Sequence, residues 1–218
     1  MNVLIACEES QRVCTAFRER GHNAFSCDII ECSGGHPEWH IQGDVMSVLN
    51  PILYENGFYG IKFRTCDNKA HFIVGEWDLI IAHPPCTYLS NAGARFLYPK
   101  GVLNEERLKK GLIAKALFMA LYDAKCKKIC VENPIPSKVY ELPPYSQTVQ
   151  PYEHGHPVQK KTCFWLKGLS KLQPTNIVEE RQSTKIAGNW FNKGGKDRQK
   201  NRAKTFEGIA KAMAEQWG

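Results

Sequence analysis

The stretch Trp77-Asp78-Leu79-Ile80-Ile81-Ala82-His83-Pro84-Pro85-Cys86-Thr87-Tyr88 decides the fold. Its first half, Trp77 to Ala82, is a short apolar run rich in β-branched residues, which is typical of a strand buried on both faces. The two prolines that follow forbid a helix and remove two backbone donors. The sequence therefore predicts a central strand that ends in a stiff loop and presents Cys86 beyond its carboxyl end, where open α/β sheets bind ligands.

A second apolar strand, Lys128-Ile129-Cys130-Val131, ends in Glu132-Asn133-Pro134. The two strand ends together resemble the cytosine-5 DNA methyltransferases, whose Pro-Pro-Cys loop supplies a thiolate nucleophile and whose Glu-Asn strand end supplies a carboxylate for the cytosine ring. The resemblance implies that Cys86 attacks carbon-6 of the base and that Glu132 binds ring nitrogen-3, with a pKa raised by burial. Asn133 is expected to brace the loop through its amide. Substrate contacts are expected from the loop residues Pro85, Ser90 and Asn91 and from the later pair Lys160 and Lys161.

The beginning of the chain reads as a β-α-β unit. We expect a strand from Asn2 to Ala6, a helix from Ser10 to Arg20 and a strand from Asn23 to Cys27. Asp28 follows the second strand, where an acid commonly accepts ribose hydroxyls, although capping the next turn is an equally open role. A third strand, His40 to Val45, contains Asp44, and the resemblance implies that this acid faces an adenine amino group.

The loop after the first strand lacks the Gly-x-Gly-x-x-Gly motif and reads Ala6-Cys7-Glu8-Glu9-Ser10-Gln11. Two carboxylates would repel a pyrophosphate, so this loop argues against a dinucleotide cofactor. S-adenosylmethionine has no phosphate, and its sulfonium and ammonium charges are compatible with acidic neighbours. The family usually has glycines here, and this chain departs from that pattern. The expected cofactor contacts are Ala6, Cys7, Glu8, Glu9, Asp28, Ile29, Asp44, Val45 and Pro84.

Two features between the expected strands need separate interpretations. The residues Cys27, Cys32, His36 and His40 could be arranged as a zinc site, but their spacing matches no known zinc module and packing is favoured. Residues 51–76 form an insertion in which two apolar runs flank Asp67-Asn68, a turn signal that predicts a β-hairpin.

The second half of the chain completes an α/β pattern. Asn104 is expected to cap a helix whose apolar part, Leu112 to Tyr122, lies buried against the sheet, and Thr205 to cap a C-terminal helix with an apolar stripe. Thr148 to Gln150 and Thr162 to Leu166 read as an antiparallel edge pair. The predicted fold class is α/β, a Rossmann-like S-adenosylmethionine-dependent methyltransferase fold with a mostly parallel sheet and an antiparallel edge pair.

The length of the chain and its cysteines indicate a single domain with free thiols. The chain of 218 residues fits one methyltransferase-like domain, 1–218. Its nine cysteines are an odd number, and the first apolar run is too short for a signal peptide, so free thiols are favoured over disulfides. We therefore expect a cytoplasmic protein of a bacterial or phage-infected cell.

The net charge of +7 is concentrated late in the chain, where the segment 193–204 carries six basic residues and one acid. Such a segment suits a phosphate backbone, although a solvated loop is an equal alternative.

Lys167 to Lys204 is too short for a full target-recognition domain, which favours a small, phage-type enzyme. The function expected from the resemblance is methyl transfer to carbon-5 of cytosine in DNA. Two alternatives remain: modification of a pyrimidine nucleotide or RNA base by the same chemistry, and a non-catalytic nucleic-acid-binding protein.

Overall fold

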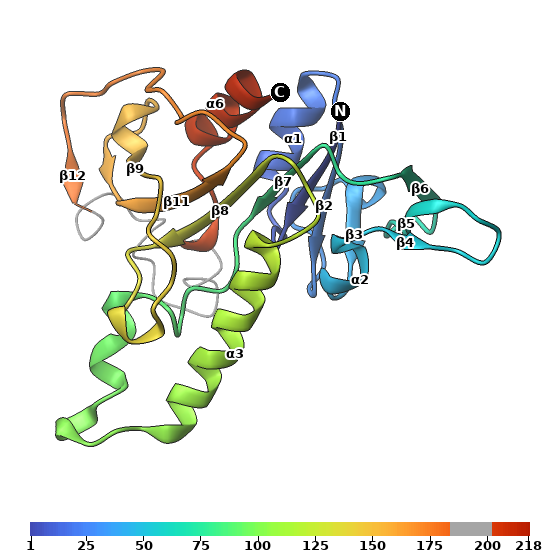
Figure 1. Ribbon diagram of the computed structural model, residues 1–218. Helices are drawn as coiled ribbons and strands as arrows, with labels where there is room; N and C mark the ends of the chain where they lie inside the picture. Colours follow the sequence, from blue (N-terminus) through green and yellow to red (C-terminus); the bar gives the residue numbers. More distant parts are fainter. Residues whose placement is uncertain (184–201) are drawn as a thin grey trace.

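A seven-stranded sheet forms the centre of the molecule (Figure 1). The computed structural model describes residues 1–183 and 202–218. The strand order is β3-β2-β1-β7-β8-β11-β9, in which β11 is antiparallel to both of its neighbours and the other pairs are parallel. This confirms the predicted α/β class, with a mostly parallel Rossmann-like sheet and an antiparallel pair at one edge. The strands are β1 (Asn2–Ala6), β2 (Asn23–Asp28), β3 (His40–Gln42), β7 (Leu79–Ala82), β8 (Ile129–Pro134), β9 (Gln147–Val149) and β11 (Thr162–Lys167).

The central strands are buried on both faces, as their unbroken apolar runs predict. In β1, Val3 and Ile5 belong to one hydrophobic cluster, and Leu4 and Ala6 belong to a second cluster on the opposite face. Side chains along a strand alternate between faces, so two separate cores enclose the sheet.

Helices cover each of these cores. They are α1 (Arg12–Glu19), α2 (Met46–Leu49), α3 (Glu105–Tyr122) and α6 (Glu207–Trp217). Helices α1 and α6 contribute to the core that contains Val3, and α2 and α3 contribute to the core that contains Leu4. Short 3-10 turns occupy Pro37–Trp39, Asn91–Phe96, Pro99–Gly101, Lys138–Tyr140 and Pro151–Glu153. None of the helices in the described ranges is both long and apolar enough to cross a membrane.

Two small sheets flank the large one. The insertion at 51–76 contains β4 (Ile52–Leu53), β5 (Tyr59–Arg64) and β6 (Ala70–Val74), which pair antiparallel in sequence order. The turn between β5 and β6 holds Asn68 at φ 66°, a left-handed conformation that asparagine tolerates. Strands β10 (Val158–Gln159) and β12 (Gln182–Ser183) form the second small sheet.

Two expectations about the helices need correction. Asn104 caps α3 as predicted, with its side-chain oxygen accepting from the Arg107 N–H, but Leu112 and Ile113 are exposed because the N-terminal half of α3 extends beyond the sheet (Figure 1). The predicted cap of α6 was also wrong. Its N-cap residue is the buried Phe206, and no side chain caps the helix.

Candidate functional site

The carboxyl ends of β1, β2, β7 and β8 lie along the same edge of the sheet because these strands are parallel. In the register of the sheet, Ala82 pairs with Ala6 on one side and with Val131 on the other. His83 and Glu132 are the residues that follow Ala82 and Val131, so they lie at the same level on neighbouring strands. Cys86 follows three residues later, which brings the predicted nucleophile and carboxylate to one edge.

The Pro-Pro-Cys loop is attached to the chain that follows β8. The side-chain amide of Asn133 is buried and donates to the Pro84 carbonyl oxygen at 2.9 Å. Further along, the Asn91 N–H donates to the Ile135 carbonyl at 2.8 Å and the Ser137 N–H donates to the Leu89 carbonyl at 2.7 Å. These bonds attach the loop to the chain that follows β8, and the Asn133 side chain makes one of them.

Three predicted substrate residues lie in this loop. Pro85 and Asn91 are exposed at the edge of the sheet, whereas Ser90 is buried and its N–H donates to the Cys86 carbonyl at 3.0 Å. This hydrogen bond closes a turn that begins at Cys86 and ends at Ser90. The residue Cys86 itself is exposed, so its thiol is accessible at the rim of the loop.

A buried histidine and carboxylate form the centre of the site. Nδ1 of His83 lies 3.0 Å from Oε2 of Glu132, and the two side chains are only 8% and 17% exposed. Burial by itself lowers the pKa of His83, but the hydrogen bond and charge of Glu132, with a smaller effect of Glu8, raise it above its ordinary value. Burial by itself raises the pKa of Glu132, but the His83 hydrogen bond and charge outweigh burial and lower it.

The two shifts favour an ion pair, in which Glu132 is ionised and His83 carries the proton. The expectation that burial raises the pKa of Glu132 was therefore wrong, because sequence reasoning considered burial without a buried cation. The second ring nitrogen of His83, Nε2, is buried and has no hydrogen-bond partner among residues 1–183 and 202–218.

Glu8 is a second acid that acts on His83, and its side chain is buried. One oxygen accepts from the Val13 N–H at 2.7 Å and the other from the Cys14 N–H at 3.2 Å. Both donors belong to the first turn of α1, whose N-terminal N–H groups need acceptors. Glu8 therefore caps α1, and burial raises its pKa.

The thiol of Cys86 is influenced by charges of both signs. Desolvation by the surrounding loop and then the negative charge of Glu132 raise its pKa, while the positive charges of Lys160 and Arg202 oppose the increase. The Lys160 ammonium is fixed at 2.9 Å from the Arg202 carbonyl oxygen. Lys161 is exposed. Burial and then the charge of Glu132 raise the pKa of Cys163 to about 11, and the positive charge of Lys161 opposes this increase.

The ends of β1 and β2 and the turn after β3 form an acidic region. Burial and then the charges of Asp28 and Asp44 raise the pKa of Cys7 to about 12. The Asp28 carboxylate accepts from the Ile30 N–H at 3.2 Å, and Asp44 accepts from the Met46 N–H at 3.0 Å. Asp28 therefore does form the turn contact that was one of its two open roles. An ionised carboxylate can accept several hydrogen bonds, so the same side chain has acceptor sites left for ribose hydroxyls, its other expected role.

The other predicted cofactor residues divide into exposed and buried positions. Ile29 is 74% exposed beside Asp28. Glu9 is half-buried, and its carbonyl accepts from the Ser33 N–H at 2.8 Å. Ala6, Val45 and Pro84 are buried under the same edge.

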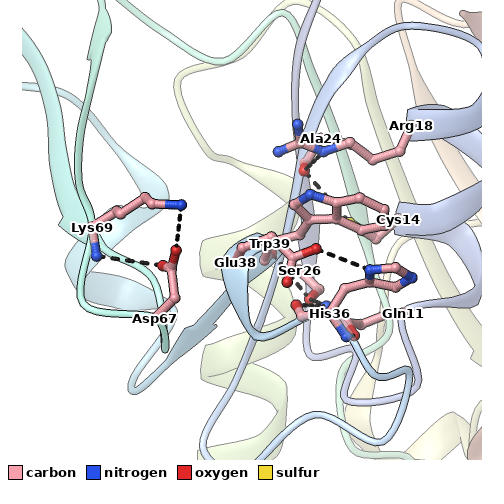
Figure 2. A network of polar contacts seen from close by, with 10 residues as sticks. All are labelled: Gln11, Cys14, Arg18, Ala24, Ser26, His36, Glu38, Trp39, Asp67 and Lys69. Atoms are coloured by element: carbon pink, nitrogen blue, oxygen red, sulfur yellow. Dashed lines mark hydrogen bonds and ion pairs between the residues drawn. The ribbon is translucent and has the colours of Figure 1, made fainter.

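A polar network fixes the loop that follows Asp28 (Figure 2). The Gln11 side chain donates to Ser26 and to the His36 carbonyl, and accepts from the His36 N–H. Arg18 on α1 donates to the Ala24 carbonyl at 2.6 Å. The long connection between β2 and β3 is thereby held against α1.

Three of the four residues considered for a metal are engaged or buried elsewhere, and the fourth, Cys32, is half-buried. Both ring nitrogens of His40 are engaged, Nδ1 with Ser26 and Nε2 with the Ile30 carbonyl, each at 2.9 Å. His36 pairs with Glu38, and Cys27 is buried in β2. Within residues 1–183 and 202–218, no group of three or more His, Cys, Asp or Glu side chains is arranged to hold a metal ion.

Sequence reasoning missed His83 altogether. The sequence contained a signal for it. His83 directly follows the apolar run of β7, just as Glu132 directly follows the apolar run of β8. The predicted basic segment falls mainly on residues 193–201, which lie outside the described ranges; Arg202 and Lys204 are inside them.

No protein-family model matches the chain, and no curated protein matches it. Two solved structures are similar to it at low sequence identity. One is a candidate DNA modification methyltransferase encoded within a prophage (E. coli), with a TM-score of 0.47 and 16% identity over 85% of this chain and 53% of that protein. The other is the Entamoeba histolytica methyltransferase EhMeth, with a TM-score of 0.46 and 13% identity over 87% and 60% of the two chains. This chain thus spans between half and two thirds of each.

Proposed function

We propose that this protein transfers a methyl group from S-adenosylmethionine to carbon-5 of cytosine in DNA through a covalent adduct with Cys86. One observation carries the proposal: an accessible thiol and a buried carboxylate lie at the carboxyl ends of the neighbouring strands β7 and β8 and interact electrostatically. That edge is where open α/β sheets bind ligands, and covalent attack on a pyrimidine requires both groups together.

The acidic region beside this pair suits the proposed methyl donor. Cys7, Asp28 and Asp44 interact electrostatically there, which disfavours a pyrophosphate and favours a ligand with positive charge. Asp28 would accept ribose hydroxyls, Asp44 an adenine amino group, and the exposed Ile29 would cover an apolar ring face. S-adenosylmethionine, when bound, supplies an electrophilic methyl group.

Cys86 performs the covalent step. The Cys86 thiol gives its proton to solvent, its sulfur then bonds to carbon-6 of cytosine, and the electron pair displaced from the 5,6 double bond makes carbon-5 nucleophilic toward the methyl group. After methylation, carbon-5 loses its proton to solvent, the carbon–sulfur bond breaks, and the double bond is restored. Because the thiol pKa is raised in the free protein, Lys160 and Arg202 are the groups that stabilise the thiolate during attack.

Glu132 and His83 hold the base and one proton. The ionised Glu132 accepts a hydrogen bond from the exocyclic amino group of cytosine. The same carboxylate accepts a hydrogen bond from the proton on Nδ1 of His83. The pair therefore carries a proton next to ring nitrogen-3, whose basicity increases as the thiolate adds. Asn133 keeps the loop, and with it Cys86, in position.

Trapping of the adduct tests this function. An oligodeoxynucleotide with 5-fluorocytosine is incubated with the protein and S-adenosylmethionine, because fluorine cannot leave as the proton does and the adduct persists. We expect a denaturation-resistant complex that Cys86→Ser abolishes and the matched control Cys66→Ser retains, since Cys66 is also exposed.

Parallel measurements of tritiated methyl transfer to DNA, RNA and dCTP identify the substrate. Transfer to DNA supports the proposal, whereas transfer only to RNA or dCTP would assign the same chemistry to another substrate. Absence of both adduct and transfer in the folded protein would contradict the proposal and favour a role in binding alone.

A further inference from the structure

We propose that the arm formed by residues 87–115 is a binding platform for single-stranded DNA. The inference rests on the proposed function for the identity of the nucleic acid, and its evidence comes from a surface outside the catalytic pair. Figure 1 shows the arm: the loop after β7 and the N-terminal half of α3 extend away from the sheet.

An arginine stacked between two aromatic rings organises this arm. The Arg107 guanidinium lies 5.0 Å from the ring centre of Tyr88 and 5.4 Å from that of Phe96. Its Nη2 also donates to the Thr87 carbonyl at 3.0 Å, and Thr87 is the residue after Cys86. The stack is thus held directly beside the catalytic loop by a fixed side chain.

The stacked groups line an open cleft of about 340 Å³. Its other walls are formed by Pro99, Asn104, Lys110 and one acid, Glu106. This volume is within the range of about 300–1,000 Å³ that is typical of small-molecule sites, so one nucleotide base can enter. Phe96 is 51% exposed and Tyr98 is 48% exposed, so a large part of each side chain is open to solvent, and the Arg95 guanidinium lies 4.7 Å from the Phe96 ring centre.

The charge of the arm matches a phosphate backbone. Residues 87–115 carry six basic side chains and two acidic ones, a net charge of +4. One of the acids, Glu106, is already paired with Lys110 in the structure. Lys100 and Lys109 are also exposed on this arm.

Aromatic rings interleaved with positive charge favour unpaired bases over a duplex. Bases stack on aromatic side chains only when they are free of the double helix, and lysine and arginine then neutralise the phosphates. A duplex would leave the exposed rings of Phe96 and Tyr98 without partners. An apolar protein partner would leave the net charge of +4 without a complement.

Fluorescence anisotropy with a labelled single-stranded 20-mer and the corresponding duplex tests the platform, at several salt concentrations and without cofactor. We expect the wild type to bind the single strand more tightly, and Phe96→Ser to weaken binding about tenfold with little change in salt dependence. The double variant Lys109→Ala/Lys110→Ala should reduce the slope of log K against log salt by about 0.7 for each lost phosphate contact.

Matched controls use residues of the same types outside the arm. Phe58→Ser removes a ring that is 60% exposed in the insertion, and Lys125→Ala/Lys127→Ala removes two exposed lysines at the opposite edge of the sheet. These variants should bind like the wild type, and circular dichroism confirms that every variant is folded. Unchanged affinity of the arm variants, or tighter binding to the duplex, would overturn the inference.

The two proposals can fail separately. If the arm variants lose single-strand binding while the wild type forms no adduct, the platform stands and the methyl-transfer function fails. If the wild type forms the adduct and Phe96→Ser and the lysine variant bind normally, the function stands and the platform fails.

Discussion

At the scale of single residues, the buried pair of His83 and Glu132 dominates the site. Replacing His83 with glutamine leaves the Glu132 carboxylate buried without a cation, which typically costs about 3–5 kcal/mol. We expect His83→Gln to lower the free energy of unfolding by an amount near the lower end of that range at pH 5.5, because glutamine can still donate a hydrogen bond. Urea denaturation of the two proteins measures the difference.

The pH dependence of that difference identifies the ion pair. His83 has a raised pKa, so its stabilising effect is complete below its ordinary pKa of 6.5 and is lost as pH rises through the higher folded value. Glu132 has a lowered pKa, so its effect is complete above its ordinary pKa of 4.5 and is lost as pH falls through the lower folded value. The stability difference should therefore be largest between pH 4.5 and 6.5 and shrink on both sides. A difference that does not vary with pH would mean that the two side chains only pack together.

At the scale of elements, Gly111 determines how closely α3 approaches the chain after β8. A Cβ atom built at this buried position would overlap the Tyr140 hydroxyl and ring. Alanine is favoured over glycine in a helix by about 1 kcal/mol, but overpacking a buried site costs about 1–3 kcal/mol. We expect Gly111→Ala to destabilise the protein by about 1 kcal/mol in urea denaturation.

A second background separates the two effects. In Tyr140→Leu the ring is gone, so Gly111→Ala should become neutral or stabilising by up to about 1 kcal/mol, a change of sign that a double-mutant cycle detects. Stabilisation by Gly111→Ala in the wild type would show that α3 has room to move away from Tyr140.

The elements that the sequence predicted correctly are those with local causes. The buried strands β1 and β7 are continuous apolar runs, and the Asn104 cap depends on a side chain and an N–H three residues apart. The burial of α3 was predicted correctly for Phe118 and Leu121 but wrongly for Leu112 and Ile113, since an apolar helix does not reveal where the sheet beneath it ends. The cap of α6 was wrong because burial of Phe206 sets the start of that helix.

At the scale of the whole molecule, strand order and register assemble the site from distant segments. The sequence was enough to predict that Cys86 and Glu132 lie at the same edge of the sheet. Each follows a buried strand, and parallel strands have their carboxyl ends at one edge. The direction of a side chain could not be predicted in the same way. Glu8 was assigned to the cofactor, yet its carboxylate caps α1, and this depends on how the helix returns against the sheet.

Ligand binding to the folded state raises the stability of the whole molecule, which gives a test of the acidic region that needs no turnover. At a ligand concentration of about 100 times Kd, the stabilisation is about 2.7 kcal/mol. For a chain of this length, 1 kcal/mol shifts Tm by about 2–4 °C, so S-adenosylmethionine should raise Tm by roughly 5–10 °C. Cys86→Ser should keep the Tm shift with S-adenosylmethionine, because the proposed role of the thiol is to attack the cytosine base and the thiol is not part of the acidic region.

Two substitutions of Asp28 separate its turn contact from ribose binding. Asparagine can still accept from the Ile30 N–H, so Asp28→Asn should keep the Tm of the free protein but lose most of the shift with S-adenosylmethionine. Asp28→Ala loses the turn contact as well, which costs about 1 kcal/mol in the free protein. If Asp28→Asn retained the full shift, the carboxylate would serve the turn alone, and the cofactor would have to bind through other groups of this edge.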